Sequence, residues 1–306
     1  MRKIFALLLV STIWTLSCQT QKIDLALKLE KGKAYKQNTN SKVTIIQDIN
    51  GQKINTVVTV KGTMTFLVKS VDQNGYNMDL KYEKLSMAMQ LPQGEVEFSS
   101  EKKEANDIFS TILGSMKNRP FEVIMSKTGK ITDAKNVDEL WETVVNQFDE
   151  LPTLQKEQIK VQLTKAYGEE ALKGNIEMVT AIYPDHSVNK GDKWIINTNL
   201  ESGMSAKMTT DYEFTELTSD YAIIKGKSKI ETADKDAYIV SNGMPLKYDL
   251  TGEMVSEIKV DRNSGWIIEA EINQEIKGNA YIKENPQMPD GMKIPMSIIS
   301  EIEITN

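Results

Sequence analysis

The sequence predicts an α+β fold that is mainly β, with two related antiparallel β units, as curved sheets or open barrels, and a helical segment between them. Apolar and polar residues alternate on both sides of a central stretch at about 134–174, where the apolar spacing becomes helical. Turn signals such as Asn50-Gly51 separate the alternating runs. We therefore expect an N-terminal β unit at 18–183, which includes the helical segment, and a C-terminal β unit at 184–306.

The first half alternates almost from the start of the mature chain. Residues 23–29 place Ile and Leu at odd positions and mainly charged residues between them, which predicts a half-buried strand. Residues 43–47 and 54–60 flank Asn50-Gly51 and predict a hairpin. Further runs at 64–68 and 76–82 flank the turn at 72–75 and predict neighbouring antiparallel strands with one solvated face.

Helical spacing is clearest at residues 137–148, where Asn136 and Glu139 suit the N-cap and N3 positions of a capping box. A second helix is expected at 153–167, with Gly168 as its C-terminal stop. Shorter helical stretches are expected at 108–116 and 169–173. These helices would join the two β units and cover a sheet face or an open end.

Strand alternation returns at Ile176 and continues to Ile304. The turn 261–265 suits a hairpin better than a calcium loop, because it lacks the third acidic position and the Glu that ends such a loop. Lys31–Tyr35 is similar to Lys190–Trp194, with an aromatic residue three positions after the Gly in both. We interpret this likeness as a trace of an old duplication.

The N-terminus has the pattern of an export signal. Arg2 and Lys3 precede an apolar run at 4–16 that is too short for a bilayer span and suits a secretory signal peptide at 1–17. Ser17-Cys18 resembles the cleavage site of bacterial lipoproteins, which implies lipidation of Cys18 as the new N-terminus. Ordinary cleavage into a soluble periplasmic protein is the alternative.

Composition excludes several kinds of site. The chain has one Cys and one His, so a disulfide within the chain and a Cys/His zinc site are impossible. A net charge of −6 without a basic block argues against a nucleic-acid partner. His186 lies in Pro184-Asp185-His186-Ser187, where adjacent residues cannot form a catalytic triad. The sequence therefore nominates no catalytic, cofactor-binding or metal-binding residue and no cofactor.

Two segments together resemble a known family. Lys22–Tyr35 follows the signal peptide, and Tyr183–Trp194 follows the helical stretch. They are similar to an uncharacterised family of Gram-negative envelope proteins of about this length, which is catalogued only as a domain of unknown function. The resemblance implies an envelope location and a β-rich fold, and it implies no activity.

Methionine is unusually frequent, at 15 residues. Its flexible thioether can fill a core, line an adaptable apolar surface or bind a soft metal. We expect an envelope lipoprotein in the outer membrane, facing the periplasm, that binds or carries an apolar small molecule or an envelope partner without catalysis. The alternatives are an assembly or structural factor and a carboxylate-dependent envelope hydrolase.

Overall fold

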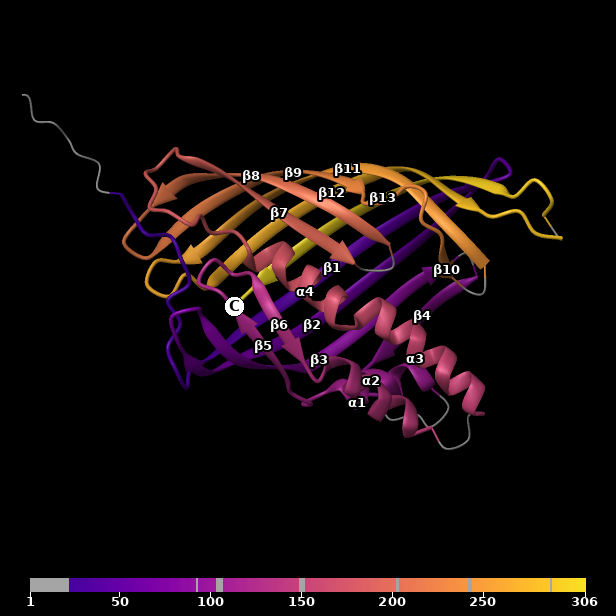
Figure 1. Ribbon diagram of the computed structural model, residues 1–306, viewed down its shortest axis with the longest axis horizontal. Coiled ribbons are helices and arrows are strands. Elements are labelled where there is room, and N and C mark those ends of the chain that lie inside the picture. The colour runs from indigo at the N-terminus through magenta and orange to yellow at the C-terminus, as the bar shows by residue number, and fades with distance from the viewer. Residues whose placement is uncertain are drawn as a thin grey trace, which may run out of the picture.

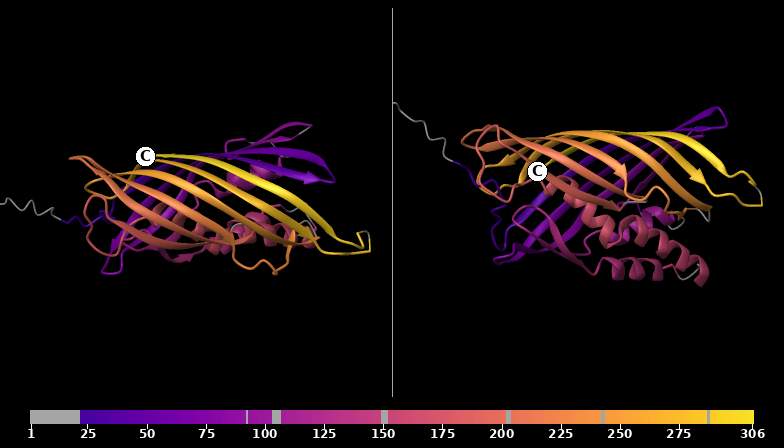
Figure 2. Two further views of the ribbon diagram at one scale, coloured as in Figure 1. Left: turned by 90° about the horizontal axis from the view of Figure 1, so that it is seen from above. Right: turned by 45° about the horizontal axis from the view of Figure 1, so that its top comes forward.

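The computed structural model describes residues 22–306 except 92, 103–106, 149–151, 202–203, 242–243 and 287. One large antiparallel sheet curves around the helix α4 (Figures 1 and 2). Its strands follow the order β6-β5-β3-β2-β1-β13-β12-β11-β9-β8-β7, with β4 beside β3 and β10 beside β11. The order ends at β6 and β7, which do not pair with each other, so the sheet is open along one side. The fold is mainly β.

The strands of the first half are β1 (Ala34–Ile49), β2 (Gln52–Val71), β3 (Tyr76–Leu91), β4 (Gly94–Ser99), β5 (Phe121–Met125) and β6 (Ile131–Lys135). Those of the second half are β7 (Lys193–Glu201), β8 (Ser205–Leu217), β9 (Tyr221–Thr232), β10 (Ile239–Ser241), β11 (Met244–Asp261), β12 (Ile267–Ile282) and β13 (Met292–Thr305). The helices are α1 (Ile108–Met116), α2 (Val137–Asn146), α3 (Thr153–Tyr167) and α4 (Glu169–Thr180). None of the helices in the described ranges is long and apolar enough to cross a bilayer.

The main core lies on the concave face, because alternate residues of every strand point inward. Phe66, Met78 and Phe214 are among the fully buried side chains there. A smaller cluster forms where α1, α2 and α3 pack together around Trp141 and against Tyr82 and Leu85 of β3. The helices therefore cover only part of the concave face.

Helix α4 lies between the two free edges of the sheet. A Cβ added at Gly174 would lie 2.8 Å from the Asn199 carbonyl of β7, so only glycine lets the helix approach that strand so closely. On the other side, the Ile131 amide of β6 donates to the Glu177 carboxylate over 2.7 Å. One helix thus contacts both edge strands and fills the gap between them.

We expect Glu177 to make the stability of this arrangement dependent on pH. Burial raises the pKa of its carboxyl above the ordinary value of 4.5, against the opposing hydrogen bond from Ile131. A carboxyl whose pKa is raised by folding favours the folded state most below its unfolded pKa, and that advantage is lost as the pH rises through the folded pKa. We expect Glu177→Gln to remove this loss, since a glutamine oxygen still accepts the Ile131 hydrogen bond without a charge. Urea denaturation at pH 4 to 8 checks this: the free energies of unfolding of the two proteins should diverge in favour of the variant as the pH rises above 4.5, and parallel curves would contradict it.

The structure confirms a mainly β fold with helices in the middle, but it does not confirm two separate β units. β1 of the first half pairs with β13 of the second half from Asn38↔Thr305 to Gln47↔Met296, so the sheet continues through the predicted junction. The similar segments do share local geometry. Gly32 N–H donates to the Val68 carbonyl over 2.8 Å, and Gly191 N–H donates to the Phe214 carbonyl over 2.7 Å.

Several local predictions are confirmed and others are wrong. Helices occur at 108–116 and 153–167 as predicted, and Gly168 ends α3. The capping box is wrong, because Asn136 adopts a left-handed conformation and its side chain makes no capping hydrogen bond. The predicted return to strand at Ile176 is also wrong: α4 continues to Thr180 and buries Ile176 and Val179 on one face. The helical region therefore extends beyond 174.

Residues 23–29 bury Leu25, Leu27 and Leu29 as the alternation predicts, but they do not form a strand of the sheet. The segment instead crosses the turns at one end of the sheet. Its Leu27 amide donates to the Lys127 carbonyl over 2.9 Å, and its Lys28 amide donates to the Ser264 carbonyl over 2.7 Å. Its leucines fill the end of the concave face, which we call the closed end.

Candidate ligand-binding face

The concave face of the sheet carries no charged side chain along β1–β3, β7–β9 and β11–β13. The pairing registers place the inward positions at odd numbers in β1 and at even numbers in β2, β11, β12 and β13. Lysines and carboxylates occupy the outward positions between them, as at Lys36, Lys61 and Glu303. An ionised group on the inner face would lose its hydration without a partner, so this face suits uncharged molecules.

Burial differs between the two ends of this face. At the closed end the inward side chains are fully buried, as at Val68 and Val260. Toward the hairpin tips they remain half-buried, although they are apolar. We call this half-buried set the open lining; it comprises Val43, Ile45, Val58, Val60, Met87, Met89, Tyr248, Met296 and Ile298. The sheet therefore presents an apolar surface that the protein itself covers only in part.

Methionine divides between two of the roles expected from the sequence. Met78, Met125, Met208 and Met254 are buried in the core. Met87, Met89 and Met296 belong to the open lining, and Met292 and Met288 pack around Ile282 and Ile294 at the hairpin tips. The hairpin tips lie opposite the closed end, and we call this side the open end. The flexible thioethers there can adapt to ligands of different shape.

A row of neutral polar side chains crosses the concave face near its middle. Ser300 lies opposite Gln274, and Gln274 lies opposite Met254. Ser228 and Thr210 continue the row, with their hydroxyl oxygens 2.8 Å apart. Ser256 lies beside the row and is 7% exposed. Its Oγ is buried without a hydrogen-bond partner among the described residues.

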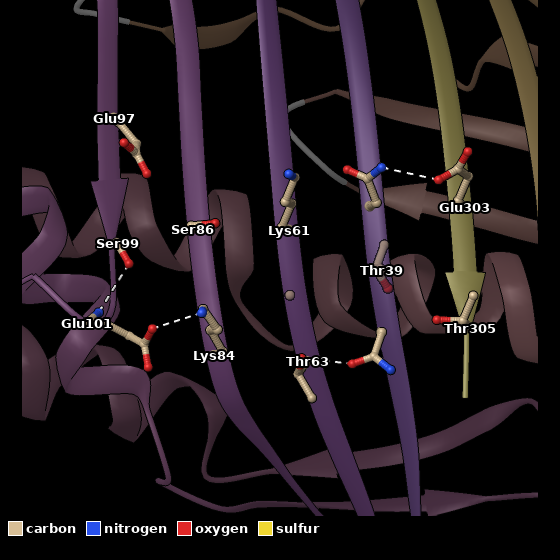
Figure 3. Close-up of a pocket in the computed structure, with 13 residues that line it drawn as sticks. Thr39, Lys61, Thr63, Lys84, Ser86, Glu97, Ser99, Glu101, Glu303 and Thr305 are labelled. Atoms are coloured by element: carbon tan, nitrogen blue, oxygen red, sulfur yellow. Dashed lines mark hydrogen bonds and ion pairs between the residues drawn. The ribbon is translucent and has the colours of Figure 1, made fainter.

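A polar cleft lies elsewhere, on the convex face. It has a volume of about 580 Å³ and crosses β13, β1, β2, β3 and β4 (Figure 3). Its polar side chains pair with one another: Asn40 donates to Glu303 over 3.2 Å, Thr63 donates to Asn38 over 2.9 Å, and Lys84 lies 2.9 Å from Glu101. Lys84 lowers the pKa of the Glu101 carboxyl. These pairs engage several of the polar side chains of the cleft within the protein itself.

The residues singled out in the sequence do not assemble into a reactive site. His186 is exposed on a loop and contacts Asp185 over 2.8 Å. Residues 261–265 form the β11–β12 turn, in which Asp261 Oδ1 accepts from the Ser264 amide over 2.7 Å. Among the described residues, no group of three or more His, Cys, Asp or Glu side chains could hold a metal ion. Cys18 lies outside the described residues.

The open lining and the polar row were missed at the sequence level, although a signal was present. Charged residues avoid one parity in each strand, as in Thr59-Val60-Lys61 and Lys259-Val260-Asp261. The sequence alone does not say whether the odd or the even positions of a given strand point to the concave face. That assignment required the pairing registers and their irregularities, such as the shift between Thr63 and Met64.

Comparison with solved structures supports the fold. A structure that describes lipid–protein interactions in lipovitellin is similar with a TM-score of 0.52 and 9% sequence identity, over 91% of this chain and 25% of that chain. The chain thus spans a quarter of the length of that protein. An outer membrane channel from Pseudomonas putida F1 aligns with 91% of this chain and 97% of its own, but its TM-score of 0.26 at 9% identity is too low to indicate a common fold.

No curated protein matches the sequence. A family model does match, over residues 73–267, from the β2–β3 turn to the first residue of β12. The match covers more than half of the chain and agrees with the expected membership of an uncharacterised family. The chain belongs to DUF6263, a family of unknown function.

Proposed function

We propose that the protein is a non-catalytic carrier or binding protein for an apolar ligand, which lies on the open lining of the concave face. The observation that carries this proposal is the concave face itself, which is free of charge and only half-covered at one end. A large apolar surface left partly exposed is typical of a site that another molecule covers. The closed end, filled by Leu25, Leu27 and Leu29, would limit how far the ligand enters.

The likeness to lipovitellin supports this proposal at the level of fold. That structure describes lipid–protein interactions. A curved open sheet partly covered by helices could shelter an acyl chain in this protein. Extending lipid binding from lipovitellin to this protein is an analogy at the level of fold, since the two sequences are 9% identical.

Lipidation of Cys18 would orient the carrier. Three residues lie between Cys18 and Lys22, so the chain reaches at most about 14 Å, over four residue steps, from an anchored Cys18 to the start of the described structure. Lys22 continues directly into the segment that fills the closed end. We infer that an outer-membrane anchor would hold the closed end near the membrane and leave the open end facing the periplasm.

The hydrolase alternative receives no support from the carboxylates. Glu177 is engaged by the Ile131 amide, and Glu83 accepts from Thr65 over 2.7 Å and contacts Lys36 over 2.9 Å, which lowers the pKa of its carboxyl. Both have structural partners. The assembly-factor alternative would require a filled concave face and is separated from the carrier by the experiment below.

Native mass spectrometry of the protein purified gently from its own envelope tests the proposal. We expect an additional mass of lipid size that is lost on denaturation, while acyl chains on Cys18 stay attached to the denatured chain. A protein that carries only its own acyl chains, and that takes up no added lipid, would contradict the carrier function and favour an assembly role. An unmodified mature N-terminus would contradict the anchor alone.

A further inference from the structure

We propose that the ligand has a neutral hydrogen-bonding group, such as a hydroxyl or an ester carbonyl, and that Ser256 and Gln274 bind it on the concave face. This inference rests on the proposed carrier function and specifies its ligand class. It depends on the polar row and on the absence of charge around it.

Ser256 has the features of an unfilled hydrogen-bonding position. Its side chain points inward from β11, opposite Gly226 of β9 and Ile272 of β12. A buried hydroxyl without a partner destabilises the folded protein, so most buried hydroxyls have one. Thr210 and Ser228 already bond to each other, but Ser256 Oγ has no partner within the described structure.

Gly226 leaves the room that the Ser256 hydroxyl occupies, beside the side chains of Tyr212 and Thr210. A Cβ added at Gly226 would lie 2.5 Å from Ser256 Oγ, so any other residue there would displace the hydroxyl. Gln274 projects from the neighbouring strand β12 on the same face, two positions from Ile272, which is opposite Ser256. Diagonal neighbours of this kind lie roughly 7–8 Å apart, a distance that one small polar group can bridge.

The chemistry of these two side chains selects the ligand. A serine hydroxyl and a glutamine amide can each donate and accept, so they suit a hydroxyl or a carbonyl. A carboxylate or a phosphate would need a cation, and the inward positions of the sheet provide none. Half-buried Gln274 adjoins the open lining through Ser300 and Ile298, which connects the polar row to the apolar surface.

Binding of a saturated fatty alcohol and the fatty acid of equal chain length to delipidated full-length protein at pH 8 tests the inference. We expect the alcohol to bind at least about tenfold more tightly, because the ionised acid would lose hydration without a cation to replace it. In Ser256→Ala the affinity for the alcohol should fall about threefold to tenfold, as expected for one hydrogen bond. Its stability should be maintained, since the lost hydroxyl has no partner.

Two further variants sharpen the test. Ser297→Ala removes a hydroxyl from the convex side of β13, opposite Ile46 and Lys277, and should leave the affinity for the alcohol unchanged. Gln274→Lys places a cation in the polar row and should reverse the preference in favour of the fatty acid. Equal or tighter binding of the acid by the natural protein, or unchanged alcohol binding by Ser256→Ala, would overturn the inference while the carrier function stands. Failure of both probes to bind would instead overturn the carrier function.

Discussion

Replacing Val58 with Glu is expected to reduce lipid binding at least about tenfold, because the new carboxylate would lie on the apolar face that the ligand covers. Val58 points inward from β2, between Val43 of β1 and Met89 of β3. It is half-buried, so the free protein can hydrate a carboxylate there. The bound ligand would remove that hydration, and the cost therefore falls on binding more than on folding.

Val57 provides a matched control. It is the same residue type, also half-buried and adjacent in β2, but it points to the convex face between Thr44 and Gln90. Val57→Glu should bind a fluorescent fatty alcohol as the natural protein does. The titration of both variants, after their folding is confirmed by circular dichroism, checks the assignment of the two faces. Equal losses in the two variants would place the ligand elsewhere.

A second large effect is expected on stability at the β5–β6 turn. Gly129 has φ +85° there, and an added Cβ would lie 1.7 Å from the Thr180 carbonyl oxygen at the end of α4. Thr180 also donates its hydroxyl to the Gly129 carbonyl over 2.7 Å. Gly129→Ala must therefore push the turn away from the helix that fills the gap in the sheet. We expect it to lower the free energy of unfolding by at least about 3 kcal/mol.

Gly51 separates this clash from ordinary backbone strain. It has nearly the same conformation, φ +84°, and nothing lies within 4 Å of an added Cβ. Gly51→Ala should lose only about 1 kcal/mol, the cost of a left-handed conformation for a residue with a side chain. Urea denaturation of both variants measures the difference. If their losses are equal, the contact between the turn and α4 contributes nothing to stability.

Local chemistry predicted much of this fold. Asn50-Gly51 gave the β1–β2 turn, and the apolar spacing gave α2 and α3. The failures occurred where tertiary contacts override local preference. Residues 23–29 alternate as a strand does, but their amides bond to the turns at Lys127 and Ser264 rather than to a neighbouring strand. Ile176 and Val179 suit either a strand or a helix, and packing between the sheet edges selects the helix.

The candidate site was less predictable than the fold. Ser256 and Gln274 lie 18 residues apart on neighbouring strands, and only the β11–β12 register brings them together. The pairing of β1 with β13 was harder still to predict, because the two strands are far apart in the sequence and no turn connects them directly. The sequence already contains uncharged residues at alternate positions of each strand. Only the pairing registers show that all these positions lie on the same face of the sheet.

The pairing of β1 with β13 has a consequence for the order of folding. β1 is among the first strands to be synthesised and β13 is the last, although they are neighbours near the middle of the sheet. Hairpins such as β1–β2 and β11–β12 can form early, but the two arms of the sheet cannot join until the final residues are available. Contacts so distant in sequence slow folding and leave strand edges exposed in the meantime. Such a chain would depend on protection from aggregation during its synthesis. Deletion of β13 should be far more damaging than the small number of residues removed suggests, because β13 joins the two arms of the sheet.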